Sequence, residues 1–245
     1  MLRLLAAPAL LIAVPAAAQD VADPPSRSLS VSGGVDLVSD YRFRGLSLSD
    51  GEVAVQPTVN LSHDSGFYLG AWGSNIDVGP AGGDVEIDLY GGYETEIASG
   101  TRLDVGLTYY WYADADKAFG PSDYGEAAVR LSYLLGPVEA KGRIAYAWDQ
   151  AALASDDSVY LSLGLSSGIP NTPVTLSAGV GYTDGALAAL APGGDYLDWS
   201  LGASATFGPV TTGVKYVDTD IAKTGVKAID RRYDATLVFS LGVVF

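Results

Sequence analysis

Residues 231–245 read RRYDATLVFSLGVVF. Every odd position from Tyr233 to Phe245 is apolar, whereas most even positions are polar or small. Successive side chains of a β-strand face opposite sides of a sheet, so this alternation predicts a strand with one apolar face. The stretch is also long enough to cross a bilayer as a tilted strand.

The same alternation recurs upstream. In residues 85–97 the odd positions are mainly aliphatic, and the carboxylates Glu86, Asp88, Glu94 and Glu96 share the even face. Applied to the whole chain, this test of alternating faces predicts twelve strands. They lie near residues 29–43, 52–63, 66–76, 84–97, 102–113, 123–135, 138–149, 157–167, 174–184, 196–207, 210–219 and 231–245.

Short turns and longer polar loops alternate strictly between these segments. Bacterial outer-membrane barrels join an even number of antiparallel strands in this way, with short turns in the periplasm and longer loops outside. We therefore predict an all-β fold, a transmembrane antiparallel up-and-down β-barrel over residues 29–245. Both termini are expected in the periplasm.

Aromatic residues sort by strand end, as in the two interfacial girdles of a membrane barrel. A soluble β-sandwich, the alternative all-β fold, gives no reason for such sorting. Phe67, Phe207 and Phe245 fall at the short-turn ends. The predicted long-loop ends carry Tyr41, Phe43, Tyr109, Trp111, Tyr146, Trp148, Tyr182, Trp199, Tyr216 and Tyr233.

The first residues predict export. Arg3 precedes an apolar run over residues 4–14, and Ala16 and Ala18 suit a small-residue cleavage site. We expect a signal peptide over residues 1–18 and a short periplasmic segment over residues 19–28. An uncleaved anchor helix is the alternative, but the apolar run is short for a bilayer span.

Composition excludes several classes of function. The chain has 14 basic and 29 acidic residues, for a formal charge of −15, so nucleic acid is not an expected partner. It contains no cysteine, which excludes disulfides and thiolate metal sites. The single histidine, His63, is expected to face outward at the periplasmic rim rather than act as a catalytic base.

Several short runs carry a family resemblance. They are VSDYRFRG (38–45), SDG (49–51), VQP (55–57), GFYLGAWGSN (66–75) and EIDLYGGY (86–93). Through them the chain resembles the TorF family of porins, over roughly residues 30–112. The resemblance implies an outer-membrane barrel with a pore, and it brings no catalytic residues and no assigned substrate.

The interior of a twelve-stranded barrel is intermediate between a packed core and an open channel. We expect the strand at 29–43 to close the barrel against 231–245, which would bring Arg42, Arg44 and Arg232 together at the outer mouth. Glu86 and Asp88 are expected a quarter-turn away. The candidate lumen and mouth residues are Asp36, Asp40, Arg42, Arg44, Glu86, Asp88, Glu126, Arg130, Lys141, Arg143, Arg232 and Asp234.

These charges have two interpretations. In the first they create a field across the mouth that orients passing solutes, and in the second they form structural ion pairs that fill the lumen. The first favours a channel for passive diffusion of small hydrophilic solutes, with a weak cation preference because acidic residues are in excess. The second favours a structural or loop-binding barrel with a closed lumen, serving adhesion or envelope integrity. An enzyme is the least favoured class.

Partners follow from the predicted location in the bacterial outer membrane. We expect contacts with membrane lipid, lipopolysaccharide and small polar solutes, and recognition of the strand ending in Phe245 by the barrel assembly machinery. No cofactor or metal site is predicted. Paired carboxylates in the outer loops, such as Asp114 with Asp116 and Asp218 with Asp220, suit a solvated loop better than calcium binding.

Overall fold

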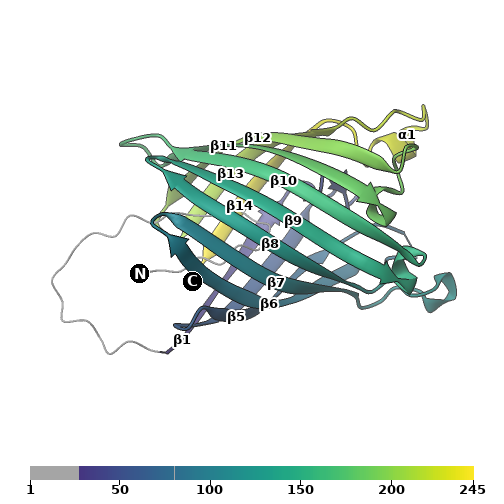
Figure 1. Ribbon diagram of the computed structural model, residues 1–245. Helices are drawn as coiled ribbons and strands as arrows, with labels where there is room; N and C mark the ends of the chain where they lie inside the picture. Colours follow the sequence, from purple (N-terminus) through teal and green to yellow (C-terminus); the bar gives the residue numbers. More distant parts are fainter. Residues whose placement is uncertain (1–27, 80) are drawn as a thin grey trace.

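The wall of the barrel consists of twelve antiparallel strands, described by a computed structural model over residues 28–79 and 81–245 (Figure 1). The order in the wall is that of the sequence, and the first and last strands pair to close it. The wall strands are β1 (Leu29–Val38), β4 (Ala54–His63), β5 (Phe67–Asn75), β6 (Val85–Ala98), β7 (Thr101–Tyr112), β8 (Tyr124–Leu135), β9 (Val138–Gln150), β10 (Asp156–Gly168), β11 (Val174–Gly185), β12 (Asp195–Phe207), β13 (Val210–Thr219) and β14 (Thr236–Val244).

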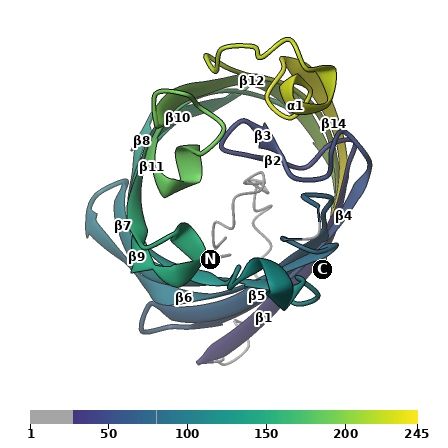
Figure 2. The same ribbon diagram turned by 90° about the vertical axis from the view of Figure 1, so that its right-hand side faces the viewer.

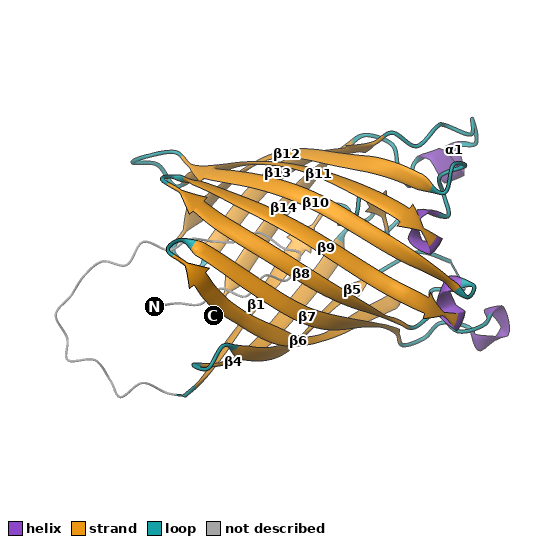
Figure 3. Ribbon diagram, in the orientation of Figure 1, coloured by secondary structure: helices purple, strands orange, loops and turns teal. Residues whose placement is uncertain are grey.

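The predicted twelve-stranded barrel is confirmed. Closure runs from the pair Gly34 and Val244 to the pair Val38 and Ser240. Short turns join the strands at one end of the barrel, which we call the turn end. The longer connections lie at the opposite end, the loop end, and carry all the short helices (Figure 3). Strand β1 begins and β14 ends at the turn end.

Two predicted strands are longer than the observed ones. The strand expected at 29–43 ends at Val38, because the following residues turn into the lumen and form the hairpin of β2 (Arg42–Phe43) and β3 (Leu46–Ser47). The strand expected at 231–245 begins only at Thr236, because a helical turn, α1 (Lys227–Asp230), precedes it. The remaining short elements at the loop end are η1 (Lys117–Phe119), η2 (Ala151–Leu153) and η3 (Ala186–Ala188).

The outer face of the wall is apolar, as the alternation predicts. On β14, Leu237, Phe239 and Leu241 are exposed on the outside. Tyr109, Trp111, Tyr146 and Trp148 are also exposed, in agreement with the predicted girdle at the long-loop ends. The placement of Tyr41 and Tyr233 in this girdle is wrong. Both rings are buried, because each belongs to a segment that folds inward from the wall. The placement of Phe43 is wrong for the same reason, since its ring contacts Tyr110 inside the lumen.

The lumen differs between its two halves. At the loop end, inward-facing side chains such as Glu86, Glu126 and Tyr196 are almost completely buried. At the turn end, the lumen-facing Ser177 is exposed, and the side chain of Arg102 is 47% exposed. The loop-end half of the lumen is therefore packed, and the turn-end half is open to water.

The expected signal peptide at 1–18 and nearly all of the expected periplasmic segment at 19–28 lie outside the described residues. Within residues 28–79 and 81–245, no helix is long and apolar enough to cross a membrane.

Candidate functional site

A hairpin folded into the lumen forms one side of the candidate site (Figure 2). Its two strands pair Phe43 with Leu46, which leaves Arg44 and Gly45 as a two-residue turn with positive φ angles of 50° and 84°. Two positive φ angles in a two-residue hairpin are typical of a type I′ turn. A Cβ on Gly45 would lie 2.5 Å from Thr219 Cγ2, so the tip of the hairpin packs directly against β13.

The base of the hairpin is held by Asp40. Its carboxylate accepts hydrogen bonds from Arg42 Nε at 2.5 Å and from Ser47 Oγ at 2.5 Å. Arg42 Nη1 in turn donates to the backbone oxygen of Arg232 at 3.2 Å and to that of Asp234 at 3.3 Å. Asp40 and Arg42 therefore tie the hairpin to the segment before β14, and they serve a structural role.

Arg44, at the tip of the hairpin, reaches across the lumen to β8. Its guanidinium forms an ion pair with Glu126 and lies 4.5 Å from the ring centroid of Tyr160. Glu126 also accepts a hydrogen bond from Arg143 Nη2 at 2.6 Å, so one carboxylate is shared by two guanidinium groups. The side chains of Arg44 and Glu126 are 3% and 1% exposed. Breaking such a buried pair leaves an uncompensated charge, which is costly.

Two further carboxylates line this half of the lumen on β6, which only β7 separates from β8. Glu86 and Asp88 project inward from β6 and are buried. Among the described residues, neither Glu86 Oε2 nor Asp88 Oδ1 has a hydrogen-bond partner. Buried polar atoms are nearly always satisfied, so these two oxygens require water, an ion or a solute.

Two arginines face each other across neighbouring strands. Arg130 on β8 is paired directly with Arg143 on β9, and like charges in such positions repel. Asp104 relieves part of the repulsion by accepting from Arg130 Nη1 at 2.7 Å. In the described part of the chain, Arg143 Nε is buried without a hydrogen-bond partner. This pair of arginines therefore retains donor capacity toward the lumen.

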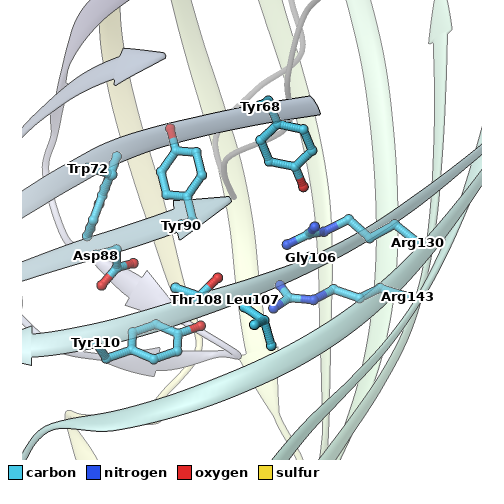
Figure 4. Close-up of a pocket in the computed structure, with 10 residues that line it drawn as sticks. All are labelled: Tyr68, Trp72, Asp88, Tyr90, Gly106, Leu107, Thr108, Tyr110, Arg130 and Arg143. Carbon is cyan, nitrogen blue, oxygen red and sulfur yellow. The ribbon is translucent and has the colours of Figure 1, made fainter. Parts of the chain in front are cut away.

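A cavity of about 20 Å³ lies between the acidic and basic sides, with room for roughly one water molecule (Figure 4). Asp88 lies at one end of it and the guanidinium groups of Arg130 and Arg143 at the other. The complete lining is Tyr68, Trp72, Asp88, Tyr90, Gly106, Leu107, Thr108, Tyr110, Arg130 and Arg143.

The structure brings some of the predicted residues together and separates others. Arg42 and Arg232 meet near the closing seam, as expected. Arg44 does not join them, because the inward turn carries it to β8. Lys141 forms an ion pair with Glu139 at 2.9 Å in the turn-end half. Asp234 forms one with Lys223 at 2.8 Å near the loop end, and Asp36 stays half-buried on the lumen face of β1.

Sequence reasoning missed the aromatic part of the site. Tyr110 stacks on Tyr124, with ring centroids 4.5 Å apart, and both rings are buried inside the lumen. Trp72 lies on the same inner face and lines the cavity. The sequence did contain a signal for these aromatic residues. Each of the three occupies a lumen-facing position of its strand, in alternation with apolar residues that face outward.

The carboxylates predicted in the outer loops have local partners, and Asp218 lies within β13 rather than in a loop. Asp114 Oδ1 accepts from the backbone nitrogen of Asp84 at 3.0 Å, and Asp218 Oδ2 accepts from the hydroxyl of Tyr216 at 2.7 Å. No group of three or more histidine, aspartate or glutamate side chains suited to a metal ion occurs in residues 28–79 and 81–245. His63 is exposed at the turn end, with Nδ1 2.7 Å from Ser65 Oγ.

Comparison with known proteins supports the fold and leaves the solute open. Residues 22–245 match the model of a family described as bacterial protein of unknown function (Gcw_chp). None of the curated proteins matches the sequence.

Solved structures with similar barrels include outer-membrane channels. The NanC porin shares 12% identity at a TM-score of 0.57, with 86% of this chain and 98% of that chain covered. The KdgM porin shares 10% at a TM-score of 0.56, covering 87% and 98%. An outer membrane channel from Pseudomonas putida F1 shares 13% at a TM-score of 0.51, covering 91% and 99%. At these identities the likeness shows a common fold.

Proposed function

Since the chain belongs to the Gcw_chp family of bacterial proteins of unknown function and folds like outer-membrane porins, we propose that it is an outer-membrane channel for passive diffusion of small hydrophilic solutes. The observation that carries this proposal is the polar lining of the constricted half of the lumen. Buried polar atoms that lack partners, such as Asp88 Oδ1 and Arg143 Nε among the described residues, are costly in a purely structural interior. They are expected in a pore that exchanges water and solutes.

The constriction carries a transverse electric field. Carboxylates on β6 face the arginines of β8 and β9, and the Arg44 side chain adds to the basic side. Separated charges of opposite sign in the lining of a narrow pore orient dipolar solutes and slow apolar ones. This arrangement replaces the field expected between the closing seam and β6, because Arg44 lies on the far side of the lumen.

A weak cation preference is part of the proposal. The formal charge of the whole chain is −15, so the barrel as a whole attracts cations toward its lumen. Carboxylate-rich passages attract cations and repel anions. The basic groups at the constriction oppose this effect, which is why the preference is expected to be weak.

One observation favours a second candidate, a barrel with a closed lumen that acts through its loops or its rigidity. The loop-end half of the lumen is packed, and the cavity there is only about 20 Å³. Conduction then requires the inward hairpin of β2 and β3 to shift, whereas a closed barrel requires no movement.

Single-channel recording separates the two candidates. The purified barrel is inserted into planar bilayers in KCl, and its folded state is verified by the change of gel mobility on heating. A channel gives discrete current steps, and a KCl gradient gives a reversal potential with a weak cation preference. Folded protein without any current step would refute the channel and favour the closed barrel.

A charge variant tests the role of the constriction. Replacement of Asp88 by Asn is expected to reduce the cation preference, because it removes a buried carboxylate from the packed half of the lumen. Asp116→Asn is the matched control, since Asp116 lies in an exposed outer loop where its side chain caps η1. Equal reversal potentials for the two variants would contradict a selectivity filter at Asp88.

The location and partners belong to the same proposal. An exported precursor with a signal peptide at 1–18 and a periplasmic segment at 19–28 would place the turn end, and both termini, in the periplasm. The exposed ring of Phe245 would serve as the recognition residue for the barrel assembly machinery, and lipid and lipopolysaccharide would cover the outer wall. The resemblance of residues 30–112 to the TorF porins supports this assignment.

A further inference from the structure

The basic end of the lumen cavity carries an unbalanced positive charge. Arg130 and Arg143 line this end, and Arg44 is linked to it because it shares Glu126 with Arg143. Only two carboxylates pair with them, because Asp104 binds Arg130, and Glu126 is shared by the other two. The formal sum is three positive and two negative charges, so one positive charge is left at this end. A carboxylate is the natural partner for adjacent guanidinium groups, since their planar donors match its two oxygens.

The other end of the cavity has the opposite character. Asp88 is buried there, and its Oδ1 has no hydrogen-bond partner among the described residues. The rings of Trp72, Tyr90 and Tyr110 surround it (Figure 4). A carboxylate among aromatic faces attracts an ammonium group through its charge and through cation–π interactions.

The two ends together select for a particular solute. A simple cation or anion would satisfy one end and leave the other without a partner. An uncharged solute would satisfy neither. A molecule with an ammonium group and a carboxylate a few bonds apart satisfies both, and it aligns with the field across the constriction.

Size and access restrict the solute further. The cavity of about 20 Å³ holds roughly one water molecule, so the ammonium group of a solute replaces this water, and the carboxylate lies beside the partly exposed Arg130. The side chain of Arg130 is 24% exposed, which shows that the basic end contacts the water of the turn-end half. The remainder of a longer solute can extend into that wider half of the lumen.

From these observations we propose that the cavity is a binding site for small zwitterions of the amino-acid type, with the ammonium group at Asp88 and the carboxylate at Arg130 and Arg143. The inference deepens the proposed channel function by naming the solute class, and it rests on that function for its physiological meaning. Binding itself does not depend on conduction, so the two can be tested separately.

Calorimetric titration of the detergent-solubilised full barrel tests the proposal, with glycine as the probe. Ethanolamine and acetate are the matched controls, since each carries one of the two charges of glycine. We expect saturable binding of glycine, and at least tenfold weaker binding of ethanolamine and acetate. Equal affinity for glycine and for either control, or no binding of glycine, would overturn the inference.

Variants locate the site. Asp88→Asn and Arg130→Gln are each expected to weaken glycine binding at least tenfold, whereas Arg102→Gln in the turn-end half leaves it unchanged. If Asp88→Asn does not fold, the glycine affinity of Arg130→Gln alone tests the site. The side chain of Arg130 is partly exposed, so its loss is better tolerated. Unchanged glycine affinity in Arg130→Gln would refute the site.

Current recordings keep the two proposals distinguishable. KCl currents without glycine binding would refute the zwitterion site and leave the channel standing. Glycine binding by a barrel without current would support the site and refute the channel.

Discussion

Replacement of Arg44 by Ala should open the lumen. Arg44 links the inward hairpin to β8 through a buried ion pair with Glu126. Without it, the tip of the hairpin loses its charged contact and the stacking of the guanidinium on Tyr160. The packed half of the lumen should then be populated more often in a displaced, conducting state.

The size of the effect follows from burial. Removing one partner of a buried ion pair costs about 3–5 kcal/mol. Here Glu126 keeps Arg143 at 2.6 Å, so its charge stays compensated and we expect the lower part of that range. Since 1.4 kcal/mol corresponds to a factor of ten, a loss of about 3 kcal/mol shifts the equilibrium between seated and displaced hairpin roughly a hundredfold.

Two measurements check this prediction. Urea unfolding in lipid vesicles should show the loss of stability, and planar-bilayer recording should show a higher open probability or larger current steps. Arg102→Ala is the control, because the ion pair of Arg102 with Glu94 is partly exposed and worth about 0–1 kcal/mol. Arg44→Lys should fall between wild type and Arg44→Ala, since lysine keeps the charge but loses the planar fork.

The reasoning would be refuted by an Arg44→Ala barrel with wild-type stability and wild-type currents. That result would mean that the hairpin is seated by its apolar contacts and by Asp40, and that the pair with Glu126 does not restrain it. A variant with lowered stability and unchanged currents would show that the hairpin does not lie on the conduction path.

Three further outcomes are expected. Gly45→Ala should lower the unfolding free energy by about 1–3 kcal/mol, because φ is positive there and the new Cβ would meet Thr219 Cγ2 at 2.5 Å; a neutral effect in urea titration would argue against a tightly packed tip. Hydrogen bonds lower the pKa of Asp230 from an ordinary 3.8 to about 2, and the largest contribution is the bond from the Thr224 hydroxyl. The stabilisation of the loop at 220–235 by Asp230 is therefore complete above about pH 4 and is lost as the pH falls through 2. Pepsin should therefore cleave this loop of the wild type only at the lowest pH values, but should cleave the loop of Asp230→Asn across the whole acidic range. Identical pH dependence of cleavage in the two proteins would contradict the stabilising role of Asp230. Phe245→Ser should reduce the heat-modifiable, assembled fraction in the outer membrane while in vitro folding into detergent persists; equal assembly would exclude Phe245 as a recognition residue.

The sequence by itself determined the wall of the barrel. Lipid contacts one face of every spanning strand, so the requirement for apolar residues is imposed locally and repeats every second residue. Leu237, Phe239 and Leu241 show this rule, and counting it along the chain predicts the twelve strands. The lumen-facing positions of Glu86, Asp88 and Glu126 follow from the same alternation.

Only the tertiary structure decided what lies inside the wall. The run at residues 39–43 continues the alternation of β1, yet it turns inward, because packing of Tyr41 and Phe43 against lumen residues replaces contact with lipid. Arg44 and Glu126 are 82 residues apart in the chain, and nothing local specifies their pairing. It depends on closure of the barrel, which brings the hairpin and β8 to facing sides of one lumen.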